Sequence, residues 1–326
     1  MEIVEMNINR VNLKRILRKL LYKGITKNIY VYLSNIKIFL NKNLTDKEFI
    51  KKNFIKNTGI TPNLENPKEF HEKVLWLKIH YRNPLMKKCS DKYRVREYVE
   101  EKGFSNYLMN IYGAYKSFDD IDFKELPDKV FIKTNHASGL NMMIDKNNTN
   151  LKKAKKYFDK AQNFNYYKRS REWNYDGISP LLVVEPFLDM KKFNDYKFFV
   201  LDGKVEFFTI CDNLTDANGI QSLSESSINY YDKNLNLLDD IGSLRPALTK
   251  EIQFSKDLDK MWKAAEKLAA EFPYCRVDFI VSEDEVYFGE MTFYSNGGNL
   301  VIKPRERSIE MGSNIKLDDI DSRYLI

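Results

Sequence analysis

Two short segments near the C-terminus carry the residues best suited to chemistry. Arg276 and Asp278 lie two positions apart in one strand-like run, and Glu290 and Thr292 lie two apart in the next. Residues two apart in a strand share a face, so a hairpin of these runs would bring Asp278 and Glu290 together. Two carboxylates beside a guanidinium suit Mg²⁺-bound phosphates, because Mg²⁺ prefers oxygen ligands and arginine balances phosphoryl charge. The alternative is a solvent-facing pair of strands, which the apolar residues of the other face argue against.

A second candidate lies at the end of an apolar run at residues 130–134, where Lys133 precedes a loop of small and polar residues at 135–139. Backbone N–H groups in such a loop can close over phosphates, and Lys133 would add a point charge. The signal is weak in isolation, because lysines end many strands. His136 lies in the same loop, where a lone histidine is more often structural or exposed.

Three further segments give weaker signals. The apolar run at residues 181–186 continues into a proline-containing turn, and an adenine can lie against such a strand, although an ordinary core strand is the simpler explanation. Asp195 and Lys197 alternate on one strand face and either add charge to the same site or form a surface ion pair worth little. Asp91 and Lys92 lie at a helix start, where N–H groups attract anions, but a capped helix with a solvated lysine is the more usual explanation.

The order of the elements that must position these residues indicates an α+β fold with largely antiparallel sheets. The first part of the chain has the helical spacing of apolar residues, and hairpins mixed with helices follow. Asp202 and Gly203 form a strong turn signal between two strands, whereas the polar C-terminal tail is expected to be irregular. The expected strands are residues 130–134, 142–144, 181–186, 196–201, 204–210, 275–281 and 286–293, and the later helices are residues 92–102, 151–162 and 257–272.

The composition is that of a folded protein, since 43% of the 326 residues are apolar and 30% are charged. Cys89, Cys211 and Cys275 are odd in number and form no CxxC pair, which argues against a disulfide framework or a zinc site. With three histidines in the chain, a divalent metal would have to be held by carboxylates. The motifs GxGxxG, GxxxxGK[ST] and GxSxG are absent, so Rossmann, P-loop and hydrolase-elbow sites have no support.

The N-terminus shows neither a signal peptide nor a run long enough for a membrane span, so the cytoplasm is the expected compartment. The net charge of +7 falls partly in the first 60 residues. Leu13, Leu17 and Leu20 recur at helical spacing with basic residues between them, which suits either a helix on the inner face of a membrane or one that packs on its own protein. Nucleic acid is not an expected partner, because the aromatics fall mostly within strands and no nucleic-acid-binding motif occurs.

Taken together and in this order, the segments resemble the ATP-grasp superfamily, and more closely its TupA-like branch, which is associated with teichuronopeptide, capsule and other polysaccharide synthesis loci. The resemblance covers roughly residues 60–300. Each motif alone is unspecific, but six in one order make a specific match. They are NPKEFHEKVLWLK, SDKYRVREYV, FIKTNHASG, REWNYDGISPLLVVEPFL, DYKFFVLDGKV and RVDF…YFGEMTF.

The resemblance implies that ATP lies between two antiparallel-sheet lobes with Mg²⁺, and that Lys133, His136 and Arg276 are catalytic. Thr292 departs from the asparagine that many ATP-grasp enzymes have there, and a hydroxyl is a weaker metal ligand. The resemblance also implies that Lys92 and Lys133 contact the phosphates, and that the loop over the phosphates contains His136, Ser138 and Gly139. It implies that Glu185 and Leu188 lie at the adenine hinge and that Asp195 and Lys197 line the cleft. Arg276 would face the phosphoryl oxygens, and the metal would be bound by Asp278, Glu290 and Thr292.

The implied activity is the ligation of a carboxylate to an amine through an acyl phosphate, on a small molecule or glycan of surface or capsular polysaccharide synthesis, such as a uronic acid amidated by an amino acid. Two alternatives keep the fold. One is an ATP-dependent phosphotransferase acting on a glycan hydroxyl, and the other is a degenerate scaffold in a polysaccharide assembly complex. The expected parts are a basic helical segment at 1–60, a helical region at 61–128, a small lobe with the phosphate loop at 129–190 and a C-terminal lobe with the metal site at 191–326.

Overall fold

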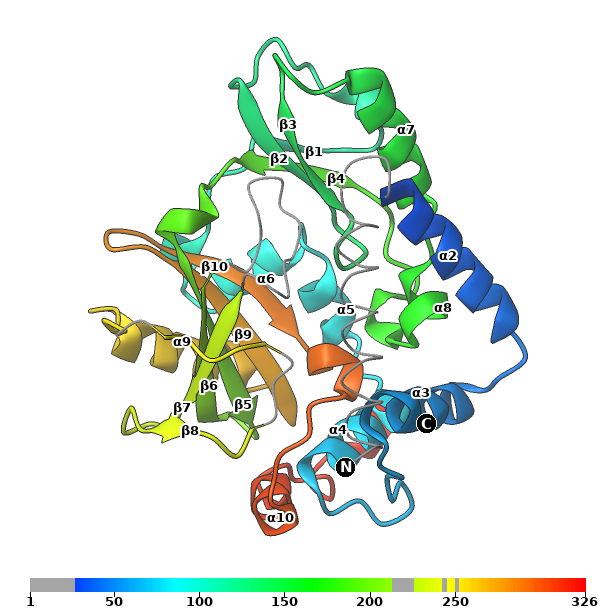
Figure 1. Ribbon diagram of the computed structural model, residues 1–326, viewed down its shortest axis with the longest axis vertical. Helices are drawn as coiled ribbons and strands as arrows, with labels where there is room; N and C mark the ends of the chain where they lie inside the picture. The colour runs from blue at the N-terminus through cyan, green and yellow to red at the C-terminus, as the bar shows by residue number, and fades with distance from the viewer. Residues whose placement is uncertain (1–26, 213–225, 242–244, 250–251) are drawn as a thin grey trace.

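Two antiparallel sheets with helices around them form the protein, and the computed structural model describes residues 27–212, 226–241, 245–249 and 252–326. The sheets lie one above the other in Figure 1, with short helices beside and between them. This is the α+β architecture with antiparallel sheets that the sequence predicts. The basic stretch around residues 13–20 lies outside the described residues.

In the described part of the chain, the smaller sheet has four strands, β1 (Gly113–Tyr115), β2 (Lys129–Thr134), β3 (Asn141–Asp145) and β4 (Leu182–Pro186). Their order is β1-β4-β2-β3, and each neighbouring pair is antiparallel. Val130 and Ile132 in β2 are fully buried, which is the alternation expected of a strand with one face on a core. Helix α7 (Leu151–Gln162) packs against β2, and its Phe158 belongs to the same core.

Within the described ranges, the larger sheet has six strands, β5 (Asn194–Leu201), β6 (Lys204–Asp212), β7 (Ser227–Tyr231), β8 (Leu237–Leu238), β9 (Tyr274–Val281) and β10 (Val286–Thr292). Their order is β10-β9-β5-β6-β7-β8. Asp202 and Gly203 join β5 to β6 with φ values of 47° and 75°, the left-handed pair that a tight hairpin turn requires. Helix α9 (Leu258–Ala269) packs on β5, β6 and β9, one face of this sheet.

A β-bulge at Gly289 places Glu290 on the same face as Asp278. Phe288 pairs with Phe279 and Glu290 pairs with Asp278, so β10 has one more residue than β9 over this stretch. Without the extra residue, strict alternation would keep Glu290 on the apolar face of Phe288. A Cβ at position 289 would lie 3.1 Å from the carbonyl oxygen of Asp278, so this close approach favours glycine.

The remaining helices surround the two sheets. The boundaries are α2 (Lys27–Leu40), α3 (Asp46–Thr58), α4 (Phe70–His80), α5 (Leu85–Ser90), α6 (Val95–Glu101), α8 (Tyr166–Ser170) and α10 (Arg305–Ser313), with 3-10 turns η2 (Ser105–Tyr107), η3 (Phe118–Asp120), η4 (Trp173–Tyr175), η5 (Met190–Lys192), η6 (Ser295–Gly298) and η7 (Ser322–Tyr324). The helix expected from residue 92 begins at Val95, because Asp91 accepts the N–H groups of Tyr93 and Arg94 and so shapes a separate turn.

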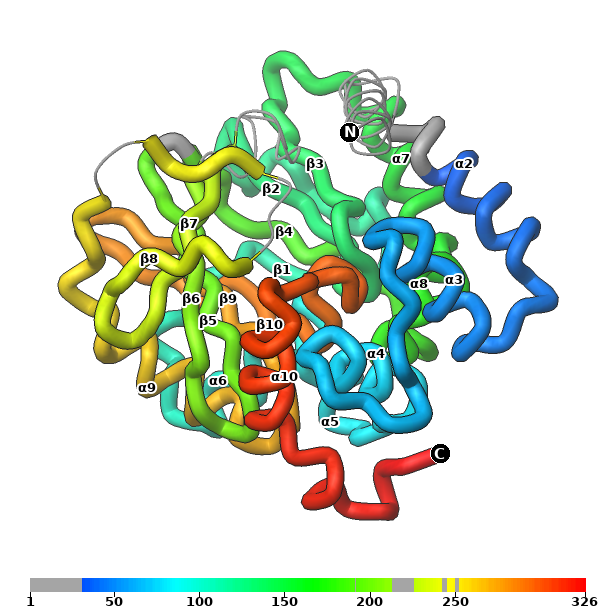
Figure 2. Tube along the Cα trace, turned by 60° about the horizontal axis from the view of Figure 1, so that its bottom comes forward, coloured from blue at the N-terminus to red at the C-terminus, as the bar shows by residue number. Residues whose placement is uncertain are grey.

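The prediction of an irregular C-terminal tail is wrong. Helix α10 packs on α4, as Figures 1 and 2 show, and buries Ser308 and Met311. Its sequence RERSIEMGS has few apolar residues, so the helix depends on tertiary contact rather than on its own propensity. The pattern of apolar residues therefore gave too little signal to predict it.

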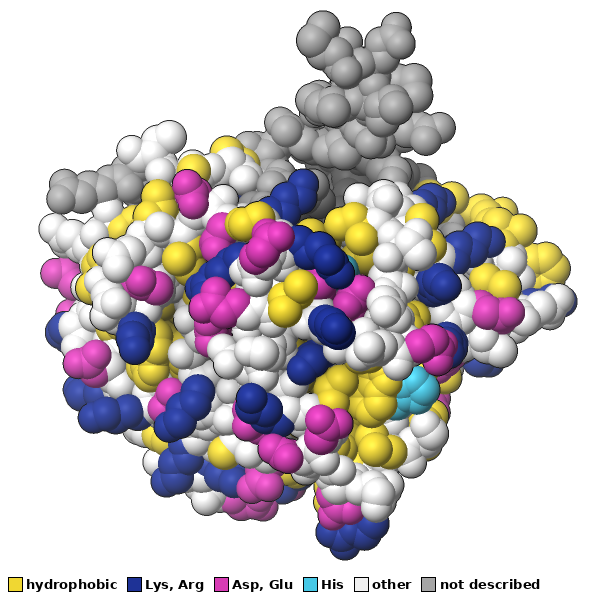
Figure 3. All heavy atoms as spheres, turned by 90° about the horizontal axis from the view of Figure 1, so that it is seen from below, with side chains coloured by type: hydrophobic (Ala, Val, Ile, Leu, Met, Phe, Trp, Pro, Cys, Tyr) yellow, Lys and Arg dark blue, Asp and Glu magenta, His cyan; other side chains and the backbone are white. Residues whose placement is uncertain are grey.

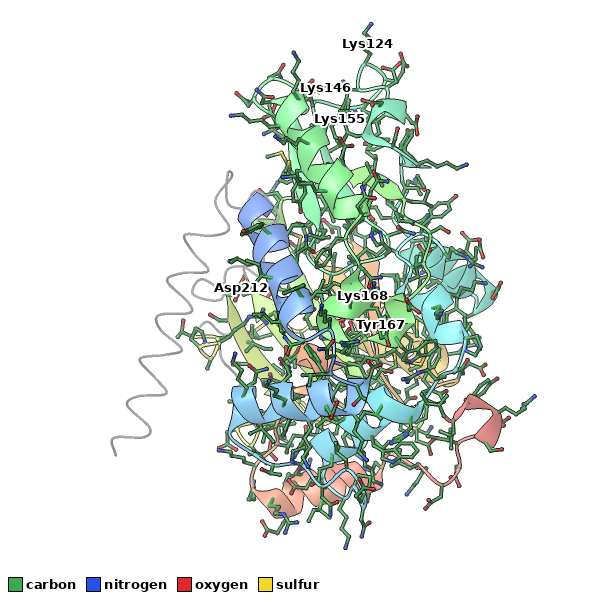
Figure 4. The ribbon with its side chains drawn as sticks, turned by 90° about the vertical axis from the view of Figure 1, so that its right-hand side faces the viewer. Lys124, Lys146, Lys155, Tyr167, Lys168 and Asp212 are labelled. Carbon is green, nitrogen blue, oxygen red and sulfur yellow. The ribbon has the colours of Figure 1, made fainter. Side chains whose placement is uncertain are left out.

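Helix α2 leaves a row of apolar side chains exposed, and α8 connects this helix to α3. The Arg169 guanidinium donates to the Ser34 hydroxyl of α2, and the Tyr167 hydroxyl donates to Asp46 of α3. Figure 4 shows Tyr167 and Lys168 between these helices.

No helix in the described ranges is both long and apolar enough to cross a bilayer. Basic and acidic side chains intermingle on the face in Figure 3. The exposed row is Tyr32, Leu33, Ile36, Phe39 and Leu40.

The three cysteines are free thiols in the interior. Cys89, Cys211 and Cys275 are all buried. Burial raises the pKa of Cys211 to about 11, and it raises the pKa values of the Cys89 and Cys275 thiols further above their ordinary value. All three side chains therefore stay protonated at neutral pH and act as small apolar core residues.

Candidate functional site

Three neighbouring strands of the larger sheet bring charged residues together. β9 lies between β5 and β10, and Asp278 on β9 is opposite Lys197 on one side and Glu290 on the other. Thr292 is opposite Arg276 in the same register. The pairing of the two strands and the meeting of Asp278 with Glu290, both expected from the sequence, are therefore confirmed.

Arg276 is the centre of this cluster. Its Nε donates to Asp278 Oδ1 and its Nη2 to Asp278 Oδ2, both at 2.6 Å. The same Nη2 donates to Glu290 Oε1 and to Thr292 Oγ1, each at 3.0 Å. The Thr292 hydroxyl in turn donates to Glu290 Oε1 at 3.0 Å. One cationic nitrogen thus contacts oxygen atoms from three residues.

Lys197 approaches Asp278 from the other side. Its Nζ donates to Asp278 Oδ2 at 2.6 Å and to Asp195 Oδ1 at 2.8 Å. Burial works to raise the pKa of Asp278, but the charges of Arg276 and Lys197 outweigh it and hold that pKa below its ordinary value. Burial raises the pKa of Asp195, whereas the pKa of Lys197 rises because the two carboxylates overcome the effect of burial. The two cations therefore favour the ionised form of Asp278.

The donor set of the cluster fits a divalent cation. Asp278, Glu290 and Thr292 offer only oxygen atoms, which are the ligands that Mg²⁺ prefers. These oxygens already converge on a positive charge, the Arg276 guanidinium. If the guanidinium turned to an anion such as a phosphate, the same oxygens would be released for a metal ion. Asp278 and Glu290 would then hold Mg²⁺, and the part of Thr292 stays a prediction.

The smaller sheet contributes an ion pair between two of the predicted residues. Lys133 Nζ lies 2.5 Å from Glu185 Oε2. Lys133 on β2 pairs with Val183 on β4, two positions from Glu185, so both side chains lie on one face. The Lys133 side chain is 24% exposed, and its contact with a phosphate stays a prediction. The assignment of Glu185 to an adenine hinge stays a prediction.

Lys92 connects the smaller sheet with the Arg276 cluster. Its Nζ donates to the carbonyl oxygen of Ala137 at 2.6 Å, and its backbone N–H to that of Asn135 at 3.2 Å. Burial lowers the pKa of Lys92; the charge of Glu290 opposes this shift and that of Lys133 adds to it. Both predicted phosphate-binding lysines therefore lie within electrostatic range of each other, and Lys92 lies within range of Glu290.

The β2–β3 loop has a buried base and an exposed tip. His136 Nδ1 lies 3.3 Å from Asn135 Oδ1, and its Nε2 has no partner among the residues described. Burial, with the charge of Lys92, lowers the pKa of His136 and so favours the neutral imidazole. Ser138 and Gly139 are exposed at the tip, and Gly139 has a φ of 78° that suits glycine. Their proposed contact with phosphates remains a prediction.

Leu188 is the predicted residue with the weakest structural support. It follows the end of β4 and is half-buried. Glu185, within β4, is turned toward Lys133 instead. The structure therefore brings Lys92, Lys133, Glu185 and the Arg276 cluster into one region, and it leaves the predicted role of Leu188 at an adenine hinge without a specific contact.

Sequence reasoning missed a second polar group beside the cluster. Lys78 on α4 is buried, and its Nζ donates to the carbonyl oxygen of Gly297 at 2.9 Å. Glu172 Oε1 lies 3.9 Å from that Nζ. The charge of Glu290 acts on both Glu172 and Tyr175. A lysine inside the apolar run VLWLKI was the one signal in the sequence that something other than core packing was needed there.

Another group of metal-ligand types lies at the start of α4. Ligand atoms of Glu69, His71 and Glu72 lie within 4.8 Å of one another. However, both Glu72 oxygens accept backbone N–H groups, including that of Lys68, and Glu69 pairs with Arg305 at 2.8 Å. Helix capping and a surface ion pair account for these carboxylates, so a metal is not needed to explain them.

Comparison with solved structures finds ATP-grasp enzymes at low sequence identity. A D-alanine–D-alanine ligase from Helicobacter pylori is 13% identical, with a TM-score of 0.45 over 78% of this chain and 68% of that one. D-cycloserine synthetase DcsG is 11% identical, with a TM-score of 0.43 over 72% of each chain. The ATP-grasp ligase PsnB complexed with a minimal precursor is 10% identical, with a TM-score of 0.39 over 72% of this chain and 63% of that one.

Comparison of the sequence itself gives a more specific result. No curated protein matches the sequence at a significant level. Residues 72–316 match the TupA-like ATPgrasp family. The match runs from α4 to just beyond α10, and so includes both sheets and every residue of the Arg276 cluster. Because it spans most of the sequence, the chain belongs to the TupA-like ATP-grasp family.

Proposed function

We propose that the protein is an ATP-dependent ligase that joins a carboxylate to an amine through an acyl phosphate. The observation that supports this most directly is the convergence of Asp278, Glu290 and Thr292 on one nitrogen of Arg276, at 2.6–3.0 Å. Such a group of fixed charges can bind phosphates and stabilise the charge that develops during phosphoryl transfer. Membership of an ATP-grasp family supports ATP as the phosphoryl donor.

Each charged residue has a part in this proposal. Lys92 and Lys133 would bind the phosphates, and Arg276 would stabilise the transferred phosphoryl group and the acyl phosphate. Asp278 and Glu290 would hold Mg²⁺, which would supply positive charge and orient the phosphates when bound. The β2–β3 loop, with Ser138 and Gly139 at its tip, would exclude water from the acyl phosphate. Catalysis would then rest on positioning and electrostatics.

The carboxylate substrate we propose is a uronic acid of a surface polysaccharide or of its precursor. This part rests on the resemblance of the six sequence motifs to proteins of polysaccharide synthesis, and it would place the reaction in the cytoplasm, where ATP is available. A glycan hydroxyl as the acceptor would give a phosphate ester instead of an amide. The product of the reaction therefore separates the two activities.

The test is ATP turnover by the purified protein with Mg²⁺, a uronic acid and an amino acid. We expect release of ADP and phosphate that requires both co-substrates. Lys133→Ala and Glu290→Gln should lower the rate by about 100-fold or more, because each removes a charge that acts on the phosphates. Lys152→Ala on α7 and Glu283→Gln in the β9–β10 turn remove similar charges from exposed positions and should leave the rate unchanged.

Each other outcome has a defined meaning. Formation of ADP without free phosphate, when only a hydroxyl acceptor is present, would contradict the ligase and favour the phosphotransferase. Absence of ATP binding in the wild-type protein would contradict both and favour a scaffold. Equal loss of turnover in Lys152→Ala and Lys133→Ala would show that the decrease reflects general charge or folding rather than the site.

A further inference from the structure

Two polar groups beside the Arg276 cluster have no part in the proposed phosphate chemistry. Glu172 precedes η4 and Tyr175 ends it. Glu172 is 9% exposed, and in the described part of the chain its carboxylate accepts no hydrogen bond; Lys78 Nζ lies 3.9 Å away. The Tyr175 hydroxyl has no hydrogen-bond partner in these ranges either. A mostly buried carboxylate whose nearest cation lies 3.9 Å away keeps its acceptor sites free for another donor.

Glu172 and Tyr175 lie next to the catalytic strands. Helix α5 packs against both η4 and β10. The turn η6 follows β10 directly, and a Cβ at Gly297 within it would lie 3.9 Å from both Glu172 Oε1 and Lys78 Nζ. In Figure 1, η6 is the orange turn that follows β10, and it packs on α4. The charge of Arg276 also acts on the pKa of Tyr175, which it lowers against the effect of burial. The two groups therefore line the same region as the proposed phosphoryl site.

Lys78 supports this arrangement without satisfying the Glu172 carboxylate. It is 3% exposed and donates to the carbonyl oxygen of Gly297 at 2.9 Å, whereas its distance to Glu172 is too long for a hydrogen bond. The charges that face Glu172 are Lys78 from α4, Glu290 from β10 and Arg169 from α8. Burial and the charge of Glu290 raise the pKa of Glu172 despite the two cations. This carboxylate is consequently a better base than an exposed one.

We propose that Glu172 binds the ammonium group of the acceptor and takes its proton, and that the Tyr175 hydroxyl is a second contact for the same group. The inference rests on the proposed ligase function and names the class of its second substrate: a primary amine that is an ammonium ion in solution. A carboxylate with free acceptor sites is complementary to an ammonium, which offers three N–H donors. An alcohol has a single O–H donor and no charge, so it matches this carboxylate less well.

The proton balance of the step is complete. The ammonium gives one proton to the Glu172 carboxylate and becomes a neutral amine. Its nitrogen attacks the acyl carbon, so the C–N bond forms while the C–O bond to phosphate breaks. The departing phosphate takes a second proton from nitrogen, the amide keeps the third, and Glu172 returns its proton to solvent. General-base catalysis by a positioned carboxylate contributes about 100-fold or more.

The test compares two kinds of nucleophile in the full-length protein with ATP, Mg²⁺ and glucuronate or galacturonate. Hydroxylamine is neutral and captures an acyl phosphate as a hydroxamate without a base, whereas glycine, L-alanine, L-glutamate and L-lysine are ammonium ions. We expect Glu172→Gln to form hydroxamate at the wild-type rate and to lose about 100-fold in kcat/KM for the amine. Tyr175→Phe should lose about tenfold, Glu172→Asp should recover part of the loss, and the exposed control Glu125→Gln should match the wild type.

The pH profile provides a second measurement that a purely structural role would not change. In the wild type, kcat/KM for the amine should fall as pH decreases through the raised pKa of Glu172, and this limb should be absent in Glu172→Gln. Equal loss of hydroxamate and amide in Glu172→Gln would place Glu172 before the acyl phosphate and overturn the inference. Wild-type hydroxamate without amide from any amine would overturn it too. Failure of the wild type to form hydroxamate would instead overturn the ligase function itself.

Discussion

Arg276 has two sets of partners available to it. In the structure its guanidinium holds Asp278, Glu290 and Thr292, and its side chain is only 12% exposed. Buried ion pairs of this kind add little net stability, because the cost of removing charges from water offsets their attraction. Their presence is understandable if an anionic substrate takes over the arginine and a metal ion takes over the carboxylates.

Lys92→Arg is expected to remove the pH dependence of ATP binding under alkaline conditions. Burial lowers the pKa of Lys92 from 10.5, so the free protein loses this positive charge as pH rises through the lowered pKa. ATP affinity should then fall with rising pH, and binding should be accompanied by proton uptake. Arginine stays charged throughout this range, so the Kd of the variant should be constant. Calorimetry between neutral pH and about pH 10, in buffers of different ionisation enthalpy, measures both effects. A wild-type Kd that is independent of pH would show that Lys92 does not bind the phosphates.

Residue types and spacing were enough to find the Arg276 cluster, because alternation in two strands forces Arg276 with Asp278 and Glu290 with Thr292 onto shared faces. They were not enough to find Glu172 or Lys78. The sequence around Lys78 has the pattern of an apolar helix. Its hydrogen-bond acceptor, the carbonyl oxygen of Gly297, is 219 positions away in the sequence. Pairing at such separation depends on how α4 and η6 pack, which no local pattern specifies.

The bulge in β10 is the element-scale feature on which the site depends most. Gly289→Ala is expected to lower ATP turnover by about tenfold or more and to cost about 1–3 kcal/mol of unfolding free energy. The added Cβ would lie 3.1 Å from the Asp278 carbonyl oxygen and 3.3 Å from its Cβ, so Asp278 must shift. Denaturant unfolding and steady-state kinetics measure the two effects.

A matched control for this substitution is available on the smaller sheet. Gly113→Ala in β1 would also bring a Cβ close to its surroundings, but there it meets the end of the Tyr115 side chain, which can rotate away. This variant should retain both activity and stability. If Gly289→Ala behaved in the same way, the bulge would not be the device that aligns Glu290 with Asp278.

Elements with a local signal were predictable, and those defined by tertiary contact were not. The β5–β6 hairpin follows from Asp202-Gly203, and the span of α7 matches the expected residues 151–162. By contrast, an alternating pattern cannot predict the extra residue at Gly289, because strict alternation would place the side chains of Phe288 and Glu290 on the same face of the strand. Helix α10 was missed for a related reason, since its stability comes from α4.

At the scale of the whole molecule, ligand binding should change stability through residues of both sheets. Mg²⁺-ATP is expected to raise the Tm of the wild-type protein, because a ligand that binds only the folded state adds about 2.7 kcal/mol at 100 times its Kd. Lys133→Ala on the smaller sheet and Glu290→Gln on the larger should each reduce this shift. Lys152→Ala should retain it. A full shift in either site variant would show that its sheet does not contribute to nucleotide binding.

The burial of all three cysteines has a practical consequence for spectroscopy. Cys89, Cys211 and Cys275 are enclosed in the core and have raised thiol pKa values, so thiol-reactive dyes should not label the native protein. A single cysteine introduced at the exposed position Ser138 would then carry the only fluorophore. Changes in its emission as nucleotide is added would report movement at the tip of the β2–β3 loop in real time, without removal of any native residue from the core.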